Sequence, residues 1–274
     1  MKPLTNIRRR LSSRLARYAA PTEPTRQLPE PLSRPVHMRV DEASSKPPTG
    51  DLYQIWQQIP GGHKWWHYFP VYESVLGHLR ERPIRFLEIG VYQGGSLAMW
   101  RRYLHADSVI VGLDIDPNCA RFDDPSMNTH VRIGDQSDAV FLRRVVEEFG
   151  PFDVIIDDGS HINSHMIRSF GELFGAGLVA QGIYIAEDTH ANFWNEYRDQ
   201  AYSFVDLCKD LVDLAHAHYL DLKGPQPFRV GNPNRAQQAG VTAIGQQVKE
   251  IRFLDSMIVI YRDAQRRLPT SEHL

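Results

Sequence analysis

Cysteine is scarce in this chain of 274 residues, in which only Cys119 and Cys208 occur. Two cysteines form neither a metal knuckle nor a disulfide framework, and their scarcity agrees with a protein of the reducing cytoplasm. Long apolar runs are missing as well. Because no run reaches about eighteen residues, the sequence predicts no transmembrane segment.

An excess of positive charge is also absent, since the formal net charge is -2. Without a global basic field the protein releases few counterions from a phosphate backbone, so nucleic acid is not expected to be its main partner. The apolar fraction of 42% and the charged fraction of 23% are those of an ordinary globular protein. A chain of this length can bury one sizeable α/β core without dividing further.

Residues 1–50 differ from the rest of the chain in composition. Residues 1–20 carry basic side chains and no acid, with apolar residues at helical spacing. This pattern leaves three interpretations open: a basic amphipathic helix on an anionic membrane or a partner, a transit peptide, or a poorly ordered tail. Seven prolines in residues 21–50 predict an extended linker. We therefore expect an N-terminal extension over residues 1–50 and one domain over residues 51–274.

Short apolar runs alternate with amphipathic segments through the middle of the chain, which predicts a parallel sheet with helices on both faces. The expected strands are 84–89, 109–113, 129–133, 154–156 and 182–186, and the expected helices are 52–58, 71–80, 96–104, 139–149, 164–174 and 202–216. Residues 223–247 read as a loop or lid, and 251–261 as two antiparallel strands around an Asp-Ser turn. The fold class is therefore α/β, a doubly wound Rossmann-like sheet that is mostly parallel with an antiparallel C-terminal edge.

A glycine-rich turn follows the first expected strand. Gly90, Gly94 and Gly95 allow the backbone to turn sharply and to approach a ligand at the start of a helix, where Ser96 lies. The spacing Gly-x-x-x-Gly-Gly differs from the pyrophosphate-binding Gly-x-Gly-x-x-Gly, so a dinucleotide is disfavoured. Glu88 directly before the turn would repel a phosphate, whereas it suits a cationic ligand such as a sulfonium amino acid.

The next two strands also end in polar residues. Asp114 stands at the tip of the second strand, where a carboxylate can accept both hydroxyls of a ribose. Asp135 and Gln136 follow the third strand and could accept the exocyclic amine of an adenine. Each residue taken alone is also an ordinary solvated turn residue. The ordered series on successive strands favours a nucleoside-containing ligand.

Paired carboxylates end the fourth and fifth strands. The fourth strand runs into Asp157 and Asp158, with His161 three residues further on, and the fifth runs into Glu187 and Asp188. Ligands of open parallel sheets bind just beyond the carboxyl ends of the strands. Four acids and a histidine there predict a site for a hard metal ion with a base beside it, although either acid pair alone could be only a turn.

These motifs together resemble those of the metal-dependent class I S-adenosylmethionine methyltransferases, in particular the enzymes that O-methylate deoxysugars of macrolides and tetracenomycins. The resemblance covers roughly residues 60–262. It implies S-adenosyl-L-methionine bound at the glycine turn, Mg²⁺ held by Asp158, Glu187 and Asp188, and His161 as general base. Asp157 is the rival ligand to Asp158 and is interpreted as a structural or cofactor-side acid. His190 either faces the substrate, as an auxiliary base, or caps the loop.

The function implied is methylation of a sugar hydroxyl, on rhamnose or another deoxysugar, in a small-molecule glycoside of antibiotic biosynthesis. Alternatives are a sugar of a polysaccharide or glycolipid, a catechol-like aromatic, or a binding protein without catalysis. The aromatic segment 63–69 is either a wall over the substrate or a packing element. Trp194 is either a wall of the sugar site or a core residue. A homo-oligomer is compatible with the sequence.

Overall fold

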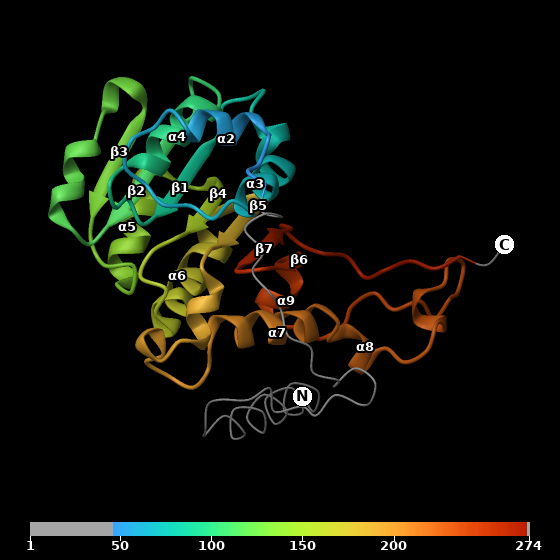
Figure 1. Cartoon of the computed structure of the whole chain (residues 1–274). Helices are drawn as coiled ribbons and strands as arrows, with labels where there is room; N and C mark the ends of the chain where they lie inside the picture. The colour runs from blue at the N-terminus through green and yellow to red at the C-terminus, as the bar shows by residue number, and fades with distance from the viewer. Residues whose placement is uncertain (1–45, 273–274) are drawn as a thin grey trace.

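The computed structural model describes residues 46–272, so the expectations for residues 1–45 lie outside it. The described chain forms a seven-stranded sheet in the order β3-β2-β1-β4-β5-β7-β6 (Figure 1). Its strands are β1 (Arg85–Ile89), β2 (Val109–Asp114), β3 (Thr129–Ile133), β4 (Phe152–Asp157), β5 (Leu178–Ala186), β6 (Val248–Leu254) and β7 (Met257–Arg262). Strands β1 to β5 run parallel to one another, and β7 is antiparallel to β5 and β6. The predicted fold class is confirmed.

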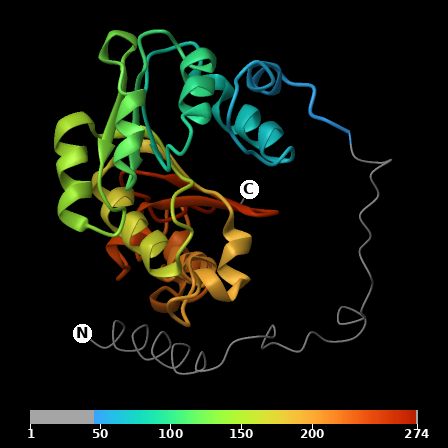
Figure 2. The same ribbon diagram turned by 60° about the vertical axis from the view of Figure 1, so that its left-hand side comes forward.

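Helices cover both faces of this sheet (Figures 1 and 2). On one face lie α2 (Asp51–Trp56), α3 (Tyr68–Leu76) and α4 (Gly95–Tyr103), and on the other α5 (Ala139–Phe149), α6 (Asn163–Ala176) and α7 (Phe204–Ala215). Each face buries its own apolar cluster. Because both faces are covered, the central strands are apolar along their whole length instead of alternating.

Local signals fix where several of these helices begin. Asp138 caps α5 by accepting hydrogen bonds from the backbone N–H groups of Val140 and Phe141. Ser203 and Asp206 form a reciprocal capping box at the start of α7. Such side chains satisfy backbone donors that have no partner within the helix, which explains why these boundaries were predicted closely.

The carboxyl ends of the central strands meet at one edge. In the sheet register Ile89 of β1 pairs with Asp157 of β4, and Asp157 pairs with Ala186 of β5. On the other side of β1, Ile89 pairs with Leu113 of β2. From β1 the chain adds β2 and β3 on one side and then β4 and β5 on the other, so the strand order reverses between β1 and β4. Open α/β sheets bind their ligands at such a switch point. The glycine turn and both acid pairs therefore stand beside one crevice.

Several boundaries differ from the expectation. Helix α3 begins at Tyr68, three residues before the expected start at 71, and β5 begins at Leu178 instead of 182. The expected loop 223–247 ends in a short helix, α9 (Ala243–Gln247), and a further helix, α8 (His218–Asp221), precedes it. The segment around α8 projects from the body at the right of Figure 1. Within residues 46–272, helices are too short or too polar to cross a bilayer.

Candidate functional site

The glycine turn after β1 needs glycine for space as well as for conformation. Gly90 has φ +97°, and a Cβ there would lie 2.1 Å from the backbone oxygen of Asp158. Gly94 has φ +75°, in the left-handed region that favours glycine. A Cβ on Gly95 would lie 2.3 Å from the backbone oxygen of Gly61. The turn therefore lies in direct contact with the end of β4 and with the segment before α3.

Glu88 lies fully buried beneath this turn. It accepts hydrogen bonds from Ser96 Oγ at 2.7 Å and from Trp100 Nε1 at 3.3 Å. Burial raises the pKa of Glu88 to about 7, and the opposing effect of the nearby Lys64 ammonium only partly offsets it. The structure thus pairs Glu88 and Ser96, two predicted cofactor residues, with each other.

Asp114 holds the outside of the same turn. Its Oδ2 accepts from the backbone N–H groups of Val91 at 2.8 Å and Tyr92 at 2.9 Å, and its Oδ1 accepts from Asp116 N at 2.9 Å. Partial burial alone would raise the pKa of Asp114, but these backbone donors lower it below its ordinary value. Asp114 is therefore a carboxylate that stays ionised at the edge of the crevice.

Gln136 and Asp157 form a buried polar group between β3, β4 and β5. Gln136 Oε1 accepts from Ser160 N at 2.6 Å, and its Nε2 donates to Asp157 Oδ1 at 3.1 Å. Asp157 Oδ2 also accepts from Ser169 Oγ at 2.5 Å and Tyr184 Oη at 2.9 Å. Burial raises the pKa of Asp157. Both side chains are thereby committed to shaping the turn after β4.

Asp135 lies outside this buried group, at the end of β3. It accepts from Ser137 N at 2.7 Å, and this backbone hydrogen bond lowers the pKa of Asp135. The structure therefore does not bring Asp135 and Gln136 together, although they are adjacent in sequence.

Asp158, His161 and Asp188 come together at the ends of β4 and β5. One ligand atom from each lies within 4.8 Å of the others, which makes them a group able to hold a metal ion. His161 Nε2 stands 3.9 Å from Asp158 Oδ1 and 3.8 Å from Asp188 Oδ2. His161 and Asp188 have φ values of +57° and +49°. Non-glycine residues with such backbone strain are concentrated at functional sites.

Glu187, the third expected ligand, lies one layer deeper and is fully buried. Its Oε1 accepts a hydrogen bond from the hydroxyl of Tyr72, and its Oε2 accepts from Lys64 Nζ at 2.7 Å. Burial and the neighbouring Asp158 raise the pKa of Glu187, whereas Lys64 acts in the opposite direction. Glu187 is thus adjacent to the group of Asp158, His161 and Asp188 without being part of it.

Sequence reasoning missed Lys64. Its side chain is only 3% exposed, and Nζ lies 2.5 Å from Asp158 Oδ2, 2.7 Å from Glu187 Oε2 and 3.8 Å from Glu88 Oε1. Burial alone would lower the pKa of Lys64, but these carboxylates raise it, so the ammonium stays charged. The only sequence signal was a single lysine within an aromatic segment that follows two glycines.

The aromatic segment 63–69 contacts the acids and packs onto the last hairpin, and its role as a wall over the substrate stays a prediction. Asp188 Oδ1 accepts from Trp65 Nε1 at 3.1 Å and from the hydroxyl of Tyr68 at 2.7 Å. The same hydroxyl donates to the backbone oxygen of Ser256 at 3.0 Å, and His67 Nε2 lies 3.1 Å from the backbone oxygen of Asp255. The turn between β6 and β7 therefore braces this segment.

An aromatic rim, formed by Trp65, His190, Trp194 and Tyr197, surrounds the exposed side of the acids. The His190 ring packs edge-on against Trp65 at 5.7 Å and Trp194 at 4.6 Å between centroids. Trp194 is 49% exposed, so it is not a core residue, and its role as a wall of the sugar site stays a prediction. Tyr197 lies 6.1 Å from the ring of His161. Aromatic faces at an open polar site suit the apolar faces of sugars and flat ligands.

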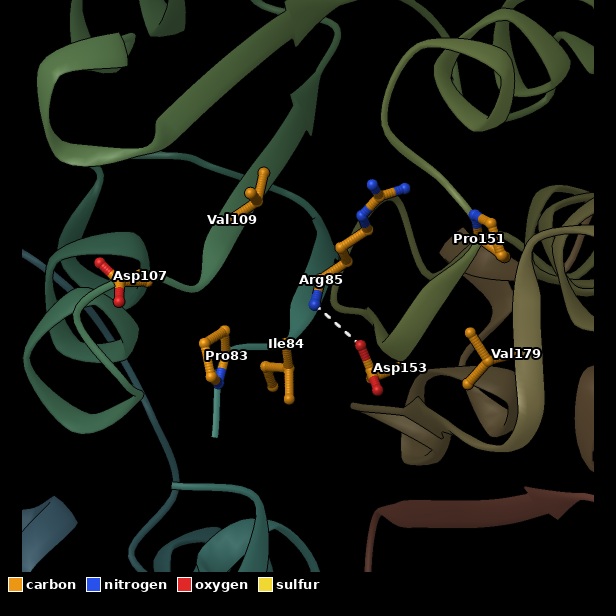
Figure 3. A pocket seen from close by; sticks show the side chains of 8 residues that line it. All are labelled: Pro83, Ile84, Arg85, Asp107, Val109, Pro151, Asp153 and Val179. Atoms are coloured by element: carbon orange, nitrogen blue, oxygen red, sulfur yellow. Dashed lines mark hydrogen bonds between the residues drawn. The ribbon is translucent and has the colours of Figure 1, made fainter. Parts of the chain in front are cut away.

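A pocket of about 400 Å³ lies at the opposite edge of the sheet, at the amino ends of the strands (Figure 3). Asp153 accepts there from Arg85 N at 2.9 Å and from Arg82 at 2.8 Å. Asp153 is thus engaged in hydrogen bonds that hold neighbouring segments of the chain together. It contains none of the predicted site residues, and ligands of this fold bind at the other edge.

Comparison with known proteins identifies relatives of one kind, although the sequence matches no protein-family profile. The 8-demethyl-8-(2-methoxy-alpha-L-rhamnosyl)-tetracenomycin-C 3'-O-methyltransferase of Streptomyces olivaceus is 38% identical over 218 residues, which are 74% of this chain and 53% of that protein. The L-olivosyl-oleandolide 3-O-methyltransferase of Streptomyces antibioticus is 37% identical over 53% of this chain and 40% of its own length. The chain spans about half the length of the curated relatives it matches.

Comparison with solved structures finds a protein of the same kind. The methyltransferase MycE of the mycinamycin biosynthetic pathway, in complex with Mg, SAH and mycinamycin VI, superposes with a TM-score of 0.64 at 26% identity. The alignment covers 78% of this chain and 54% of that one. The chain is therefore similar in sequence and in fold to sugar O-methyltransferases of antibiotic pathways.

Proposed function

We propose that this protein is an S-adenosylmethionine- and magnesium-dependent O-methyltransferase that methylates a sugar hydroxyl, of rhamnose or another deoxysugar, on a glycosylated natural product. Residues 51–274 form its catalytic domain. The observation that carries the proposal is the meeting of Asp158, His161 and Asp188 beside the glycine turn. The likeness to sugar O-methyltransferases over 74% of the chain supports the sugar as acceptor.

The donor set fits magnesium. Asp158 Oδ1 and Asp188 Oδ2 make no hydrogen bond within residues 46–272 and both face His161 Nε2. Carboxylate oxygens without a thiolate are the ligands that Mg²⁺ prefers. Asp158 and Asp188 would hold the ion, and Glu187, which lies next to them, stays the third expected ligand. A bound divalent cation makes a sugar hydroxyl more acidic and orients a vicinal diol.

His161 is the proposed general base. Its Nε2 faces the two acids, while its Nδ1 is buried and has no hydrogen-bond partner within the described residues. As the hydroxyl oxygen forms its bond to the methyl carbon, the methyl–sulfur bond breaks and Nε2 takes the hydroxyl proton. S-adenosylmethionine supplies the methyl group and leaves as S-adenosylhomocysteine. Much of the rate comes from holding oxygen, carbon and sulfur in line.

The donor is proposed to lie along the turn after β1. Asp114, ionised at the crevice edge, accepts the ribose hydroxyls, and the backbone of Gly90 and Gly94 allows the ligand to approach closely. Glu88 and Ser96 support this turn from beneath, and Asp157 acts through Gln136 on the turn after β4. Asp135 remains a proposed contact on the adenine side.

The acceptor is proposed to lie under the aromatic rim. Trp65 and Trp194 are both partly exposed and stand on either side of His190. Such walls fit the apolar face of a deoxysugar. His190 fills the space between the two indoles and is ranked after His161 as a base.

The test is transfer of labelled methyl from S-adenosylmethionine to a panel of rhamnosyl and olivosyl glycosides, with and without EDTA. We expect transfer that EDTA abolishes and added Mg²⁺ restores. In parallel, His161→Ala should lower turnover by about 10²- to 10⁴-fold while S-adenosylmethionine still binds. His78→Ala, an exposed site on the far side, is the control. Undiminished transfer in EDTA would refute the metal, and a near-normal rate of His161→Ala would move the base elsewhere.

A further inference from the structure

Each acid of the proposed metal group has one oxygen that is already engaged. Lys64 Nζ donates to Asp158 Oδ2, and Trp65 Nε1 together with the hydroxyl of Tyr68 donates to Asp188 Oδ1. The other oxygens, Asp158 Oδ1 and Asp188 Oδ2, face His161. Segment 64–68 thus engages one oxygen of each acid and leaves the other oxygen of each toward His161.

Lys64 is the charged member of this arrangement. Its ammonium lies between Asp158 and Glu187 and 3.8 Å from Glu88, so it bridges the acids of β4 and β5 and the acid below the glycine turn. The side chain is 3% exposed, and Tyr72 covers it at 5.9 Å from its ring centroid. A charge buried so deeply persists only where it is paired, and here it has three carboxylate neighbours.

We propose that Lys64 is a positioning residue of the methyl-transfer site, a permanent internal cation that orients Asp158 and Glu187 and restrains how tightly they hold magnesium. The proposal rests on the function proposed above. Lys64 acts through the two carboxylates that it contacts. It also couples the acid cluster to Glu88, so the donor side and the metal side share one counter-charge.

The proposal has an unusual consequence for a lysine-to-methionine substitution. Removing a positive charge a few ångströms from a bound dication removes repulsion between them. It also frees Asp158 Oδ2 and Glu187 Oε2 to draw the ion away from His161. Lys64→Met should therefore bind Mg²⁺ more tightly, by about tenfold or more, and yet transfer methyl at least about a hundredfold more slowly.

The first experiment is calorimetric titration of Mg²⁺ into full-length wild type, Lys64→Met and Lys209→Met, without donor or acceptor. Lys209 is an exposed lysine on α7 that pairs with Asp206, so it controls for the loss of one charge. Tighter metal binding by Lys64→Met alone, with slower turnover, supports the proposal. Unchanged or weaker metal binding overturns it, as does a normal turnover rate.

A second experiment uses the wild type, in case Lys64→Met does not fold. Reductive methylation followed by mass spectrometry measures how readily each lysine reacts, with and without Mg²⁺. We expect Lys64 to stay unreactive in both states, while the exposed Lys46 and Lys209 react. Labelling of Lys64 once Mg²⁺ is added would show that the metal expels it, which overturns a permanent role.

These outcomes separate the inference from the proposed function. Metal binding and labelling need no glycoside, so they can succeed even where no acceptor in the panel is methylated. Conversely, a wild type that binds Mg²⁺ and transfers methyl, beside a Lys64→Met variant with the same affinity and rate, would refute the role of Lys64 alone.

Discussion

The two sides of the crevice are built by different means. On the donor side, Asp114 and Asp135 are held by backbone N–H groups, and Asp116 and Ser137, two residues further along the chain, are among the donors. On the metal side, Asp158, Glu187 and Asp188 are held by side chains that lie far away in the sequence. The separation is 94 residues from Lys64 to Asp158 and 120 from Tyr68 to Asp188. The proposed donor side is therefore held by contacts between residues at most 23 apart, whereas the proposed metal side depends on contacts between residues at least 94 apart.

The largest effect should come from the metal side. Asp158→Asn removes one proposed ligand and the partner of Lys64, so an ammonium is left with less compensating charge. We expect turnover to fall by about 10³-fold or more and Mg²⁺ binding to weaken, as measured by methyl transfer and calorimetry. Asp107→Asn, exposed at the opposite edge of the sheet, should behave like wild type. Full activity of Asp158→Asn would contradict the expectation that the metal side contributes more to turnover than the donor side.

The next largest effect should be on the free energy of unfolding. It should come from Glu88, which lies where the two sides meet. Its pKa is raised from 4.5 to about 7 in the folded state, so the folded protein binds more protons than the unfolded chain in this interval. The free energy of unfolding should therefore fall as pH rises from about 4.5 to about 7, by up to ~3 kcal/mol from this group. Glu88→Gln should remove that part of the pH dependence.

Urea unfolding at several pH values measures this difference between Glu88→Gln and wild type. Glu81→Gln, an exposed neighbour in the sequence, is the control. If the free energy of unfolding changes with pH in parallel for Glu88→Gln and wild type, Glu88 is charged in both the folded and the unfolded state. The coupling between the two sides of the crevice is then absent.

Tyr68 tests a long-range contact without a change of charge. Its hydroxyl joins Asp188 to the backbone of Ser256, and it is almost fully buried. Tyr68→Phe should destabilise the protein by about 1–3 kcal/mol and lower turnover about tenfold, because buried acceptors lose their donor. Tyr53→Phe, whose hydroxyl makes no hydrogen bond within residues 46–272, is the matched control for both measurements. Equal behaviour of the two variants would argue against the orienting role.

The smallest effect is expected on the donor side. Asp114→Asn keeps the size of the side chain but turns an ionised acceptor of two backbone N–H groups into a neutral one. We expect S-adenosylmethionine to bind roughly tenfold more weakly, about 1.4 kcal/mol, with Mg²⁺ affinity unchanged. Calorimetry with each ligand separately measures both. A loss of metal affinity in this variant would show that the two sides are not independent.

This contrast also explains what the sequence alone could predict. Continuous apolar runs that alternate with amphipathic segments indicated the sheet and most helices, because these signals act over a few residues. The glycine turn, Asp114 and the acids after β4 and β5 were recognisable for the same reason. That the structure groups Asp158, His161 and Asp188 follows from the register of β4 and β5, which the expected parallel order implied.

Lys64 and Tyr68 could not be found in this way. Nothing near either residue in the sequence indicates an acid partner, since the partners lie just after the ends of β4 and β5, from 94 to 123 residues away. The residue pattern alone did not separate Asp157 from Asp158, which only the resemblance assigned to different roles. Asp157 faces the buried Ser169 and Tyr184, whereas Asp158 faces the crevice. Alternation along a strand predicts that neighbouring side chains point in opposite directions, but it does not predict which of them faces the crevice.

The turn between β6 and β7 has a consequence for exchanging parts between related proteins. Backbone oxygens of Asp255 and Ser256 receive His67, Tyr68 and the N–H of Thr189, so the last hairpin supports the first aromatic segment. The proposed wall of the acceptor site thus consists of two pieces that lie far apart in the sequence. A chimera that takes a new segment 61–69 from one relative and keeps this hairpin would join surfaces that were never selected together, whereas moving both pieces preserves their fit.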